Sequence, residues 1–237
     1  MPTSDHVIVW DLETVPDTAA FARIEGAPDL APADAEAQMG DKFPKLPLHG
    51  IVCIGALIAR WTQGQTHGYW AVRSLGAPHV GERSEAEIIQ AFADRIYELQ
   101  PQLVSFNGHG FDLPVLRYRA MVHHVAAPGL TRRPYFNRYT DDALDLCDVL
   151  ASYDPRSRMS LDGLSRFLGL AGKPEGVDGS QVAAVVKEGR IQEVAAYCES
   201  DVVNTYRIWL RYELFRGALS REGWRLSEEA LVGFLGG

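Results

Sequence analysis

Acidic residues that could bind metal ions stand at three separated places in the chain: Asp11 with Glu13, then Asp112, then Asp201. Asp11 and Glu13 are two residues apart at the end of an apolar run, so in a strand both side chains leave the same face. Two such carboxylates can hold one divalent cation. Because an Asp-x-Glu triplet arises by chance about once in a chain of this length, this pair alone is weak support for a metal site.

Two further patterns supply the other acids. Asp112 ends the segment Phe106-Asn-Gly-His-Gly-Phe-Asp112, which follows an apolar run and precedes a helix, so its carboxylate can enter the same cleft. Tyr197 and Asp201 are four residues apart in a long helical segment, which places them on one helical face. All three patterns in this order are a rare coincidence at average composition. We therefore predict that they form one site.

Four clustered carboxylates repel one another unless cations enter between them, so their first role is metal binding. Two divalent ions about 3.5–4 Å apart can stabilise the attacking and the leaving oxygen of a phosphodiester. Oxygen ligands favour Mg²⁺, with Mn²⁺ as a substitute, and metal-bound water supplies the nucleophile. Tyr197 has an ordinary pKa near 10 and is predicted to orient that water. The predicted ligands of the two ions are Asp11, Glu13, Asp112 and Asp201.

On these residues the sequence resembles the tyrosine branch of the DEDD exonuclease superfamily. It matches the five motif positions of that branch without substitution, at Asp11, Glu13, Asp112, Tyr197 and Asp201. Residues 106–114 resemble the second exonuclease motif of family B DNA polymerases. More narrowly, most of the chain resembles stand-alone predicted exonucleases related to that proofreading domain. The resemblance implies a ribonuclease H-like (DnaQ-like) α/β fold and metal-dependent 3′–5′ exonuclease activity, and the tyrosine excludes the histidine branch.

The predicted reaction is hydrolysis of single-stranded DNA, or of an unpaired 3′ end, to nucleoside 5′-monophosphates. An exoribonuclease with the same site is an open alternative, because such sites bind mainly phosphates and the terminal sugar. A non-catalytic nucleic-acid-binding or adaptor domain is a third, although a pure binder has no reason to hold repelling charges together. The predicted substrate contacts are Leu12, Asn107, Phe111, Arg117 and Lys173.

Several of these contacts have competing interpretations. Asn107 is also a common turn former, and Phe111 fits the core better than a nucleotide contact. Residues 113–140 contain five arginines, four aromatic residues and no acid, which suits a single-strand channel as well as an ordinary solvated helix. Lys173 lies in a glycine-containing loop that cannot be a nucleotide phosphate loop, because Pro174 replaces the Ser or Thr that would bind magnesium.

Two polar clusters are interpreted without a catalytic role. The spacing of four aspartates fits the N-terminus and exposed face of a helix; they are Asp141, Asp142, Asp145 and Asp148. The pair His123 and His124 has no matching ligand set and is predicted to be exposed.

The elements that must position these residues follow from the apolar patterning. Strands are expected at 6–10, 50–60, 66–74 and 103–106, with the second and third forming a hairpin. A capping box at Ser84-x-x-Glu87 begins one helix, and later helices are expected at about 113, 142–150, 160–168, 180–187, 191–215 and 227–234. Residues 14–49 are predicted to form an irregular excursion that includes one short helix. This order predicts one domain over 1–237, with a mixed sheet flanked by helices.

The composition limits the function further. A formal net charge of −8 excludes a protein that coats duplex nucleic acid through bulk electrostatics. Three distant cysteines indicate reduced buried thiols rather than disulfides or a zinc site. The apolar run 51–59 is too short to span a bilayer, so a soluble, cytoplasmic protein is expected.

Overall fold

The computed structural model describes residues 4–40, 42–172 and 179–236. Within them, five strands form one sheet in the order β3-β2-β1-β4-β5. The strands are β1 (His6–Pro16), β2 (His49–Gln63), β3 (Gly68–Gly76), β4 (Gln102–Ser105) and β5 (Ala143–Asp145). Because β1 pairs antiparallel with β2 and parallel with β4, the sheet is mixed, as the sequence predicted.

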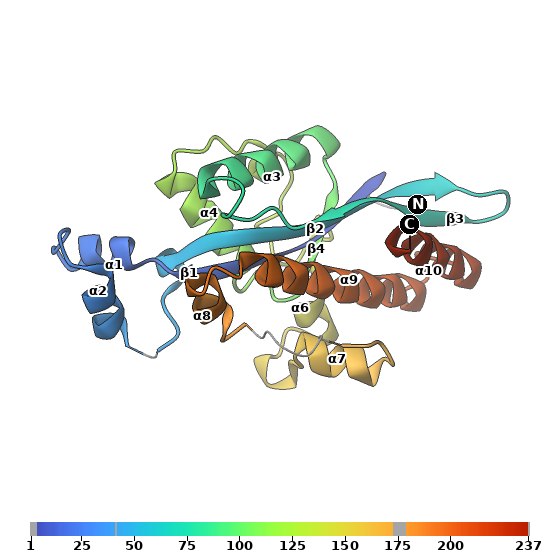
Figure 1. Cartoon of the computed structure of the whole chain (residues 1–237). Helices are drawn as coiled ribbons and strands as arrows, with labels where there is room; N and C mark the ends of the chain where they lie inside the picture. Colours follow the sequence, from blue (N-terminus) through green and yellow to red (C-terminus); the bar gives the residue numbers. More distant parts are fainter. Residues whose placement is uncertain (1–3, 41, 173–178, 237) are drawn as a thin grey trace.

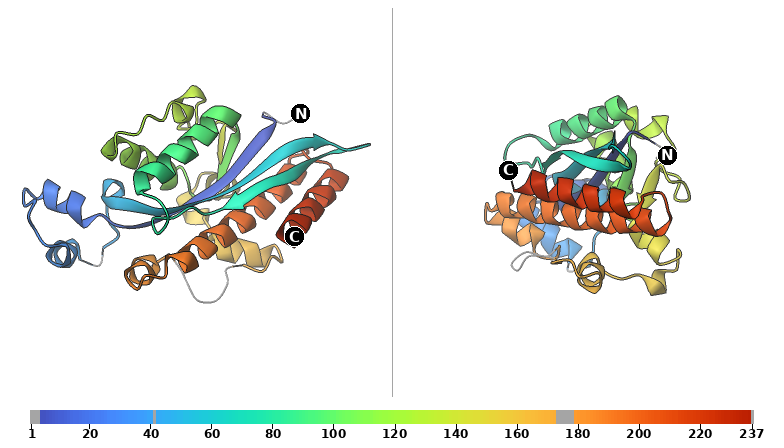
Figure 2. Two further views of the ribbon diagram at one scale, coloured as in Figure 1. Left: turned by 45° about the horizontal axis from the view of Figure 1, so that its top comes forward. Right: turned by 90° about the vertical axis from the view of Figure 1, so that its right-hand side faces the viewer.

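Helices cover both faces of this sheet (Figures 1 and 2). One face carries α3 (Glu85–Leu99) and α4 (Asp112–Val122), and the other carries α9 (Ile191–Phe215) and α10 (Arg221–Leu235). The shorter helices are α1 (Thr18–Ile24), α2 (Pro32–Met39), α5 (Gly129–Arg132), α6 (Leu146–Leu150), α7 (Leu161–Phe167), α8 (Val182–Lys187) and the 3₁₀ turns Leu46–Leu48 and Pro155–Ser157. No helix in the described part of the chain has the length and apolar character needed to cross a membrane.

Strand β1 directs its alternate side chains to the two helical layers. Ile8 and Leu12 are buried in the apolar cluster that includes α3 and α4, whereas Val7 and Val9 are buried in the cluster that includes α9. Because side chains alternate along a strand, Asp11 continues the α9-facing row. The acids therefore lie on the side of the sheet where α9 runs.

Several predicted elements differ from the structure. Residues 14–49 hold two α-helices rather than one short helix, since Asp17 caps α1 by accepting from the Ala20 amide and Pro32 begins α2. Residues 142–150 are not one helix: residues 143–145 form β5, paired parallel with β4, and only then does α6 begin. The C-terminal helix is longer than the predicted 227–234, because Ser220 caps it by accepting from the Gly223 amide.

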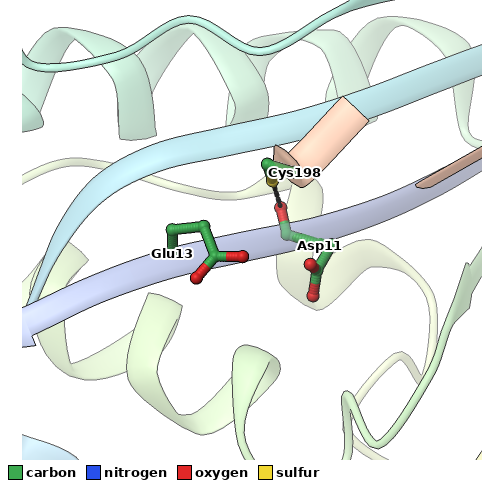
Figure 3. A group of neighbouring side chains, drawn as sticks. All are labelled: Asp11, Glu13 and Cys198. Carbon is green, nitrogen blue, oxygen red and sulfur yellow. Dashed lines mark hydrogen bonds between the residues drawn. The ribbon is translucent and has the colours of Figure 1, made fainter. Parts of the chain in front are cut away.

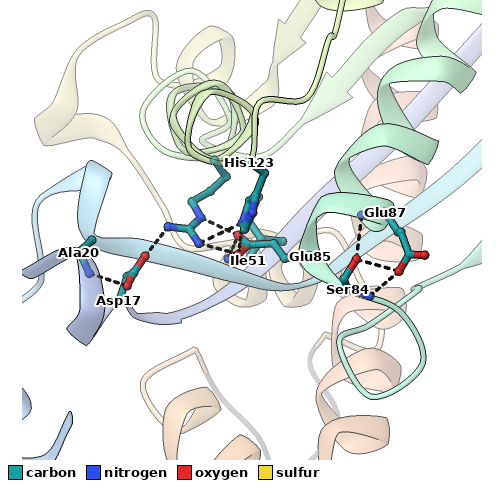
Figure 4. A network of polar contacts seen from close by, with 8 residues as sticks. Asp17, Ala20, Ile51, Ser84, Glu85, Glu87 and His123 are labelled. Atoms are coloured by element: carbon teal, nitrogen blue, oxygen red, sulfur yellow. Dashed lines mark hydrogen bonds and ion pairs between the residues drawn. The ribbon is translucent and has the colours of Figure 1, made fainter. Parts of the chain in front are cut away.

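A buried ion network joins the helical layer to β2 (Figure 4). Arg119, which is 5% exposed, donates to both carboxylate oxygens of Glu85 at 2.6 Å and also to Asp17. Glu85 additionally accepts from the amide of Ile51 at 2.7 Å and bonds to His123 at 2.7 Å. Arg119 is therefore structural rather than part of a phosphate channel, and His123 is half-buried rather than fully exposed.

We expect Arg119→Met to lower the free energy of unfolding by about 3–5 kcal/mol, because it leaves two largely buried carboxylates without their cation. Urea denaturation would measure the loss. Arg117→Met on the same helix is the matched control, since the exposed Arg117 guanidinium stacks on the rings of Tyr118 and Phe136 and such contacts contribute about 0.5–1 kcal/mol. Equal losses in both variants would contradict the structural role of Arg119.

Candidate active site

A cleft of about 470 Å³ lies where β1, the loop after β4 and α9 meet. The structure brings all five predicted catalytic side chains to this cleft, which is lined by Asp11, Glu13, Asp112, Tyr197 and Asp201. Three of the five predicted substrate contacts also line it: Leu12, Asn107 and Phe111. Three segments that are far apart in the sequence thus converge on one surface.

Asp11 and Glu13 lie along β1 (Figure 3). Each offers an oxygen within 4.8 Å of the other and of the Cys198 thiol of α9. The thiol donates to the backbone carbonyl of Asp11 at 3.7 Å, so it ties the helix to the strand. A register shift in the β1–β2 ladder follows Glu13 directly, and such bulges bend a strand and redirect its side chains.

Asp112 is the first residue of α4 and is only 3% exposed. Burial, followed by the charges of Asp11 and Asp145, raises the pKa of its carboxyl well above the ordinary value. The backbone N–H groups of Asp112 itself and of Leu12 donate to the carboxylate and partly offset this rise. Ionising Asp112 in this site is therefore unfavourable, and a bound cation would offset that cost.

Asp145 holds the loop between β4 and α4 in place through hydrogen bonds to its backbone amides. The carboxylate of Asp145 accepts from the amides of Asn107 at 2.7 Å, His109 at 3.0 Å and Cys147 at 3.0 Å. Since Asp145 is 2% exposed, the prediction that it lies on an exposed helical face is wrong. The sequence signal that could have placed it is its position between Leu144 and Leu146, at the end of a short apolar strand.

Asn107 both closes a turn and lines the cleft. It has a positive φ of 70°, and its carbonyl accepts from the amides of Gly110 and Phe111 at 3.0 Å. Its side-chain oxygen accepts from Arg158 at 3.1 Å, so the amide N–H groups are what Asn107 can offer a substrate. No motif in the sequence indicates a role for Arg158.

Arg158 is itself held by Asp148. Asp148 is fully buried, at 0% exposure, and accepts from Arg158 and from two nitrogens of Arg138. These two guanidinium groups lower the pKa of Asp148 against the opposing effect of burial, which is the largest single influence. Asp148 is thus an internal anchor rather than an exposed helical acid, and Arg138 belongs to this anchor.

Tyr197 and Asp201 come from the buried face of α9, with exposures of 3% and 4%. Burial raises the pKa of the Tyr197 phenol far above its ordinary value, and the charges of Asp201, Glu13 and Asp11 raise it further. The phenol also hydrogen-bonds to Asp201. It therefore stays protonated at neutral pH and can act as a neutral hydrogen-bonding group.

Of the two remaining predicted contacts, one is described by the structure, and it does not line the cleft. Arg117 is exposed and stacks on Phe136 rather than lining the cleft, and Lys173 lies outside the described residues. In the 113–140 segment, Arg133 pairs with Asp142 and Arg132 stacks on Tyr97. The arginines of this segment are thus occupied by the protein itself.

A protein-family model matches the part of the chain that carries Asp112, Tyr197 and Asp201. The model described as "Predicted 3′-5′ exonuclease related to the exonuclease domain of PolB" matches residues 41–236. The chain belongs to this family. It is therefore an exonuclease-type protein related to the polymerase B exonuclease domain, as the motifs in the sequence predicted. No curated protein matches the chain.

A family B DNA polymerase of solved structure shares its fold. The family B DNA polymerase from Pyrobaculum calidifontis superposes with a TM-score of 0.56 at 17% identity, over 91% of this chain and 25% of the polymerase. Escherichia coli exonuclease I in complex with a dA16 oligonucleotide matches at 15% identity with a TM-score of 0.35, over 86% of this chain and 44% of that chain. The chain thus spans a quarter of the polymerase and less than half of exonuclease I. The predicted ribonuclease H-like fold is confirmed.

Proposed function

We propose that the protein is a metal-dependent 3′–5′ exonuclease that removes nucleoside 5′-monophosphates from single-stranded DNA or unpaired 3′ ends. The observation that carries this proposal is the convergence of four carboxylates and one tyrosine in a single cleft. Buried carboxylates that repel one another are costly to a fold, so their assembly needs a functional reason. Binding of cations to which a phosphate can coordinate supplies that reason.

The donor set fits Mg²⁺ or Mn²⁺, because carboxylate oxygens are the ligands these ions prefer. The residues that would hold them are Asp11, Glu13, Asp112 and Asp201. Cys198 is not expected to join them, since its hydrogen bond with Cys53 and its burial raise the pKa of the thiol well above the ordinary value. When bound, two such ions would supply charge stabilisation and an activated water.

The chain's own groups are proposed to position the reactants. Tyr197, as a protonated phenol, orients the attacking water by hydrogen bonding. The amide N–H groups of Asn107 donate to an oxygen of the terminal phosphate or sugar, with Arg158 fixing the amide orientation. Leu12 contributes its backbone amide, which holds Asp112. These roles require no residue outside the cleft and its immediate support.

The proposed reaction is tested by incubating 5′-labelled and 3′-labelled DNA and RNA strands with the protein and Mg²⁺ or Mn²⁺. We expect 5′-labelled DNA to shorten stepwise from its 3′ end and 3′-labelled DNA to release labelled mononucleotide at once. Digestion of RNA alone would favour the exoribonuclease alternative. Intact strands of both kinds under both metals would refute the nuclease.

Metal binding is expected to raise the melting temperature by roughly 5–10 °C. A ligand at a hundred times its Kd stabilises the folded state by about 2.7 kcal/mol, and each kcal/mol shifts Tm by about 2–4 °C at this chain length. Differential scanning fluorimetry with Mn²⁺, followed by EDTA, measures the rise and its reversal. An adaptor domain without a metal site would show neither change.

Tyr197→Phe is expected to lower kcat by about ten- to a hundredfold while KM changes little, because orientation of the water matters only on the path to the transition state. Steady-state digestion of a labelled DNA strand provides both constants. Tyr206→Phe, which removes another buried hydroxyl from the same helix, is the control and should keep kcat. Unchanged turnover in Tyr197→Phe would remove this tyrosine from the mechanism.

A further inference from the structure

A second hollow, of about 820 Å³, adjoins the acidic cleft. The two share Thr14, Phe43 and Gly179 in their linings, so a polymer entering one can continue into the other. The far wall is formed by α2 and α8, which are joined by an ion pair between Glu36 and Lys187 at 2.5 Å. We call it the α2–α8 hollow. Because α2 precedes the family-matched residues 41–236 and α8 lies within them, the family match does not account for the α2 side of this wall.

Phe43 stands at the junction of the cleft and the hollow with 75% of its surface exposed. Its ring centroid lies 4.9 Å from that of His49 and 5.7 Å from that of Phe111. Burying a phenylalanine contributes about 1.5–3 kcal/mol, so leaving this ring in water forgoes stability. The exposed ring is nevertheless backed by two others, which leaves one side open to a planar ligand.

The backbone beside Phe43 is fixed in place. His49 is 3% exposed, and its ring nitrogens bond to the carbonyl of Pro44 at 3.1 Å and to the hydroxyl of Thr14 at 3.0 Å. Thr14 follows Glu13 on β1, so the same contacts tie the segment carrying Phe43 to the strand that carries the acids. The backbone that carries the ring is therefore held at a set position relative to the cleft.

Two lysines stand near Phe43 in the sequence, and their positive charge suits contact with the phosphates of a nucleic acid. The chain has only four lysines against a net charge of −8, and two of them, Lys42 and Lys45, flank this ring in sequence. Both lysines are exposed, and Lys42 lines the α2–α8 hollow. An aromatic face between cations, at the rim of a groove, is the arrangement by which proteins hold single strands.

We propose that Phe43 is a stacking platform for a nucleobase of the bound single strand, with Lys42 and Lys45 contacting its phosphates as it passes from the acidic cleft into the α2–α8 hollow. This inference rests on the proposed function, which it deepens by assigning a strand-binding subsite. It involves no covalent step. Stacking tolerates any base, so the subsite selects single-stranded nucleic acid without selecting its sequence.

The test compares a 5′-fluorescein-labelled dT oligonucleotide with the same strand carrying three abasic nucleotides at its 3′ end. We expect Phe43→Ala to lower kcat/KM on the dT strand by about five- to a hundredfold, the range given by loss of one base–aromatic stack, and to leave kcat/KM on the abasic strand unchanged. Phe43→Trp should retain wild-type activity on both. Phe215→Ala, which removes a ring that is 84% exposed at the end of α9, is the matched control and should change neither value.

Wild-type activity of Phe43→Ala on the dT strand, or the same loss on both strands, would overturn the platform. Anisotropy of the labelled dT strand in Ca²⁺ separates this failure from failure of the proposed function. If the wild type cleaves neither strand, the nuclease proposal fails, and binding decides the subsite. Weaker binding by Phe43→Ala then supports the platform, and equal binding overturns it.

Discussion

Asp112→Asn is expected to abolish nuclease activity and, in EDTA, to raise the melting temperature. The activity should fall at least about a thousandfold, because loss of several kcal/mol of metal-derived transition-state stabilisation corresponds to that factor. The stability should rise because burial and the charges of Asp11 and Asp145 disfavour the ionised form of Asp112. Asparagine keeps the shape of the side chain and removes that charge.

Two measurements check this expectation together: digestion of a labelled DNA strand in Mg²⁺, and thermal unfolding with and without metal. The variant should also lose most of the metal-induced rise in Tm. Asp94→Asn, at an exposed position on α3, is the control and should preserve both activity and the metal response. A variant that stays active, or that melts at a lower temperature in EDTA, would show that Asp112 is not a strained metal ligand.

Much of the sheet and its helices could be predicted because their signals are local. The Ser84 and Glu87 capping box is formed as expected, with both hydrogen bonds present. The alternation of β1 correctly placed Asp11 and Glu13 on one face, and the four-residue spacing brought Tyr197 and Asp201 to one side of α9. Each of these inferences needs only the repeat of a single element.

The errors arise where a partner is distant in the sequence. The spacing of Asp145 to Asp142 and Asp148 is helical, so the sequence predicts a helix there. In the structure Asp145 instead ends β5, a strand of three residues that is defined by its pairing with β4. Likewise, Arg119 meets Asp17 across 102 positions and Glu85 across 34. No local sequence pattern indicates such pairings. From the sequence alone, an arginine that forms a buried ion pair therefore cannot be told from one that binds a ligand.

The sequence likewise does not show what sets the distance between β1, which carries Asp11 and Glu13, and α9, which carries Tyr197 and Asp201. Gly55 of β2 is the register partner of Asp11 on β1 and lies directly beneath α9. A Cβ atom at Gly55 would stand 2.7 Å from the Cys198 thiol, 3.1 Å from a methyl of Val202 and 3.3 Å from the Cys198 carbonyl. The absence of a side chain here allows α9 to approach the strand that carries Asp11.

Gly55→Ala is therefore expected to push α9 outwards and to lower kcat/KM at least tenfold, since small misplacements of catalytic groups are costly. Overpacking should also reduce the free energy of unfolding by about 1–3 kcal/mol. Activity assays and urea denaturation measure the two effects. Gly76→Ala is the control, because a Cβ there meets nothing within 4 Å.

Adding Cys198→Ala tests whether the close contact between position 55 and the Cys198 thiol causes this loss of activity. Removing the thiol deletes the 2.7 Å clash, so Gly55→Ala combined with Cys198→Ala should regain part of the activity that Gly55→Ala loses. The coupling between two residues in contact is expected to reach about 0.5–3 kcal/mol. If the two losses simply add, the spacing of Tyr197 and Asp201 from β1 is set by something other than the Gly55 contact.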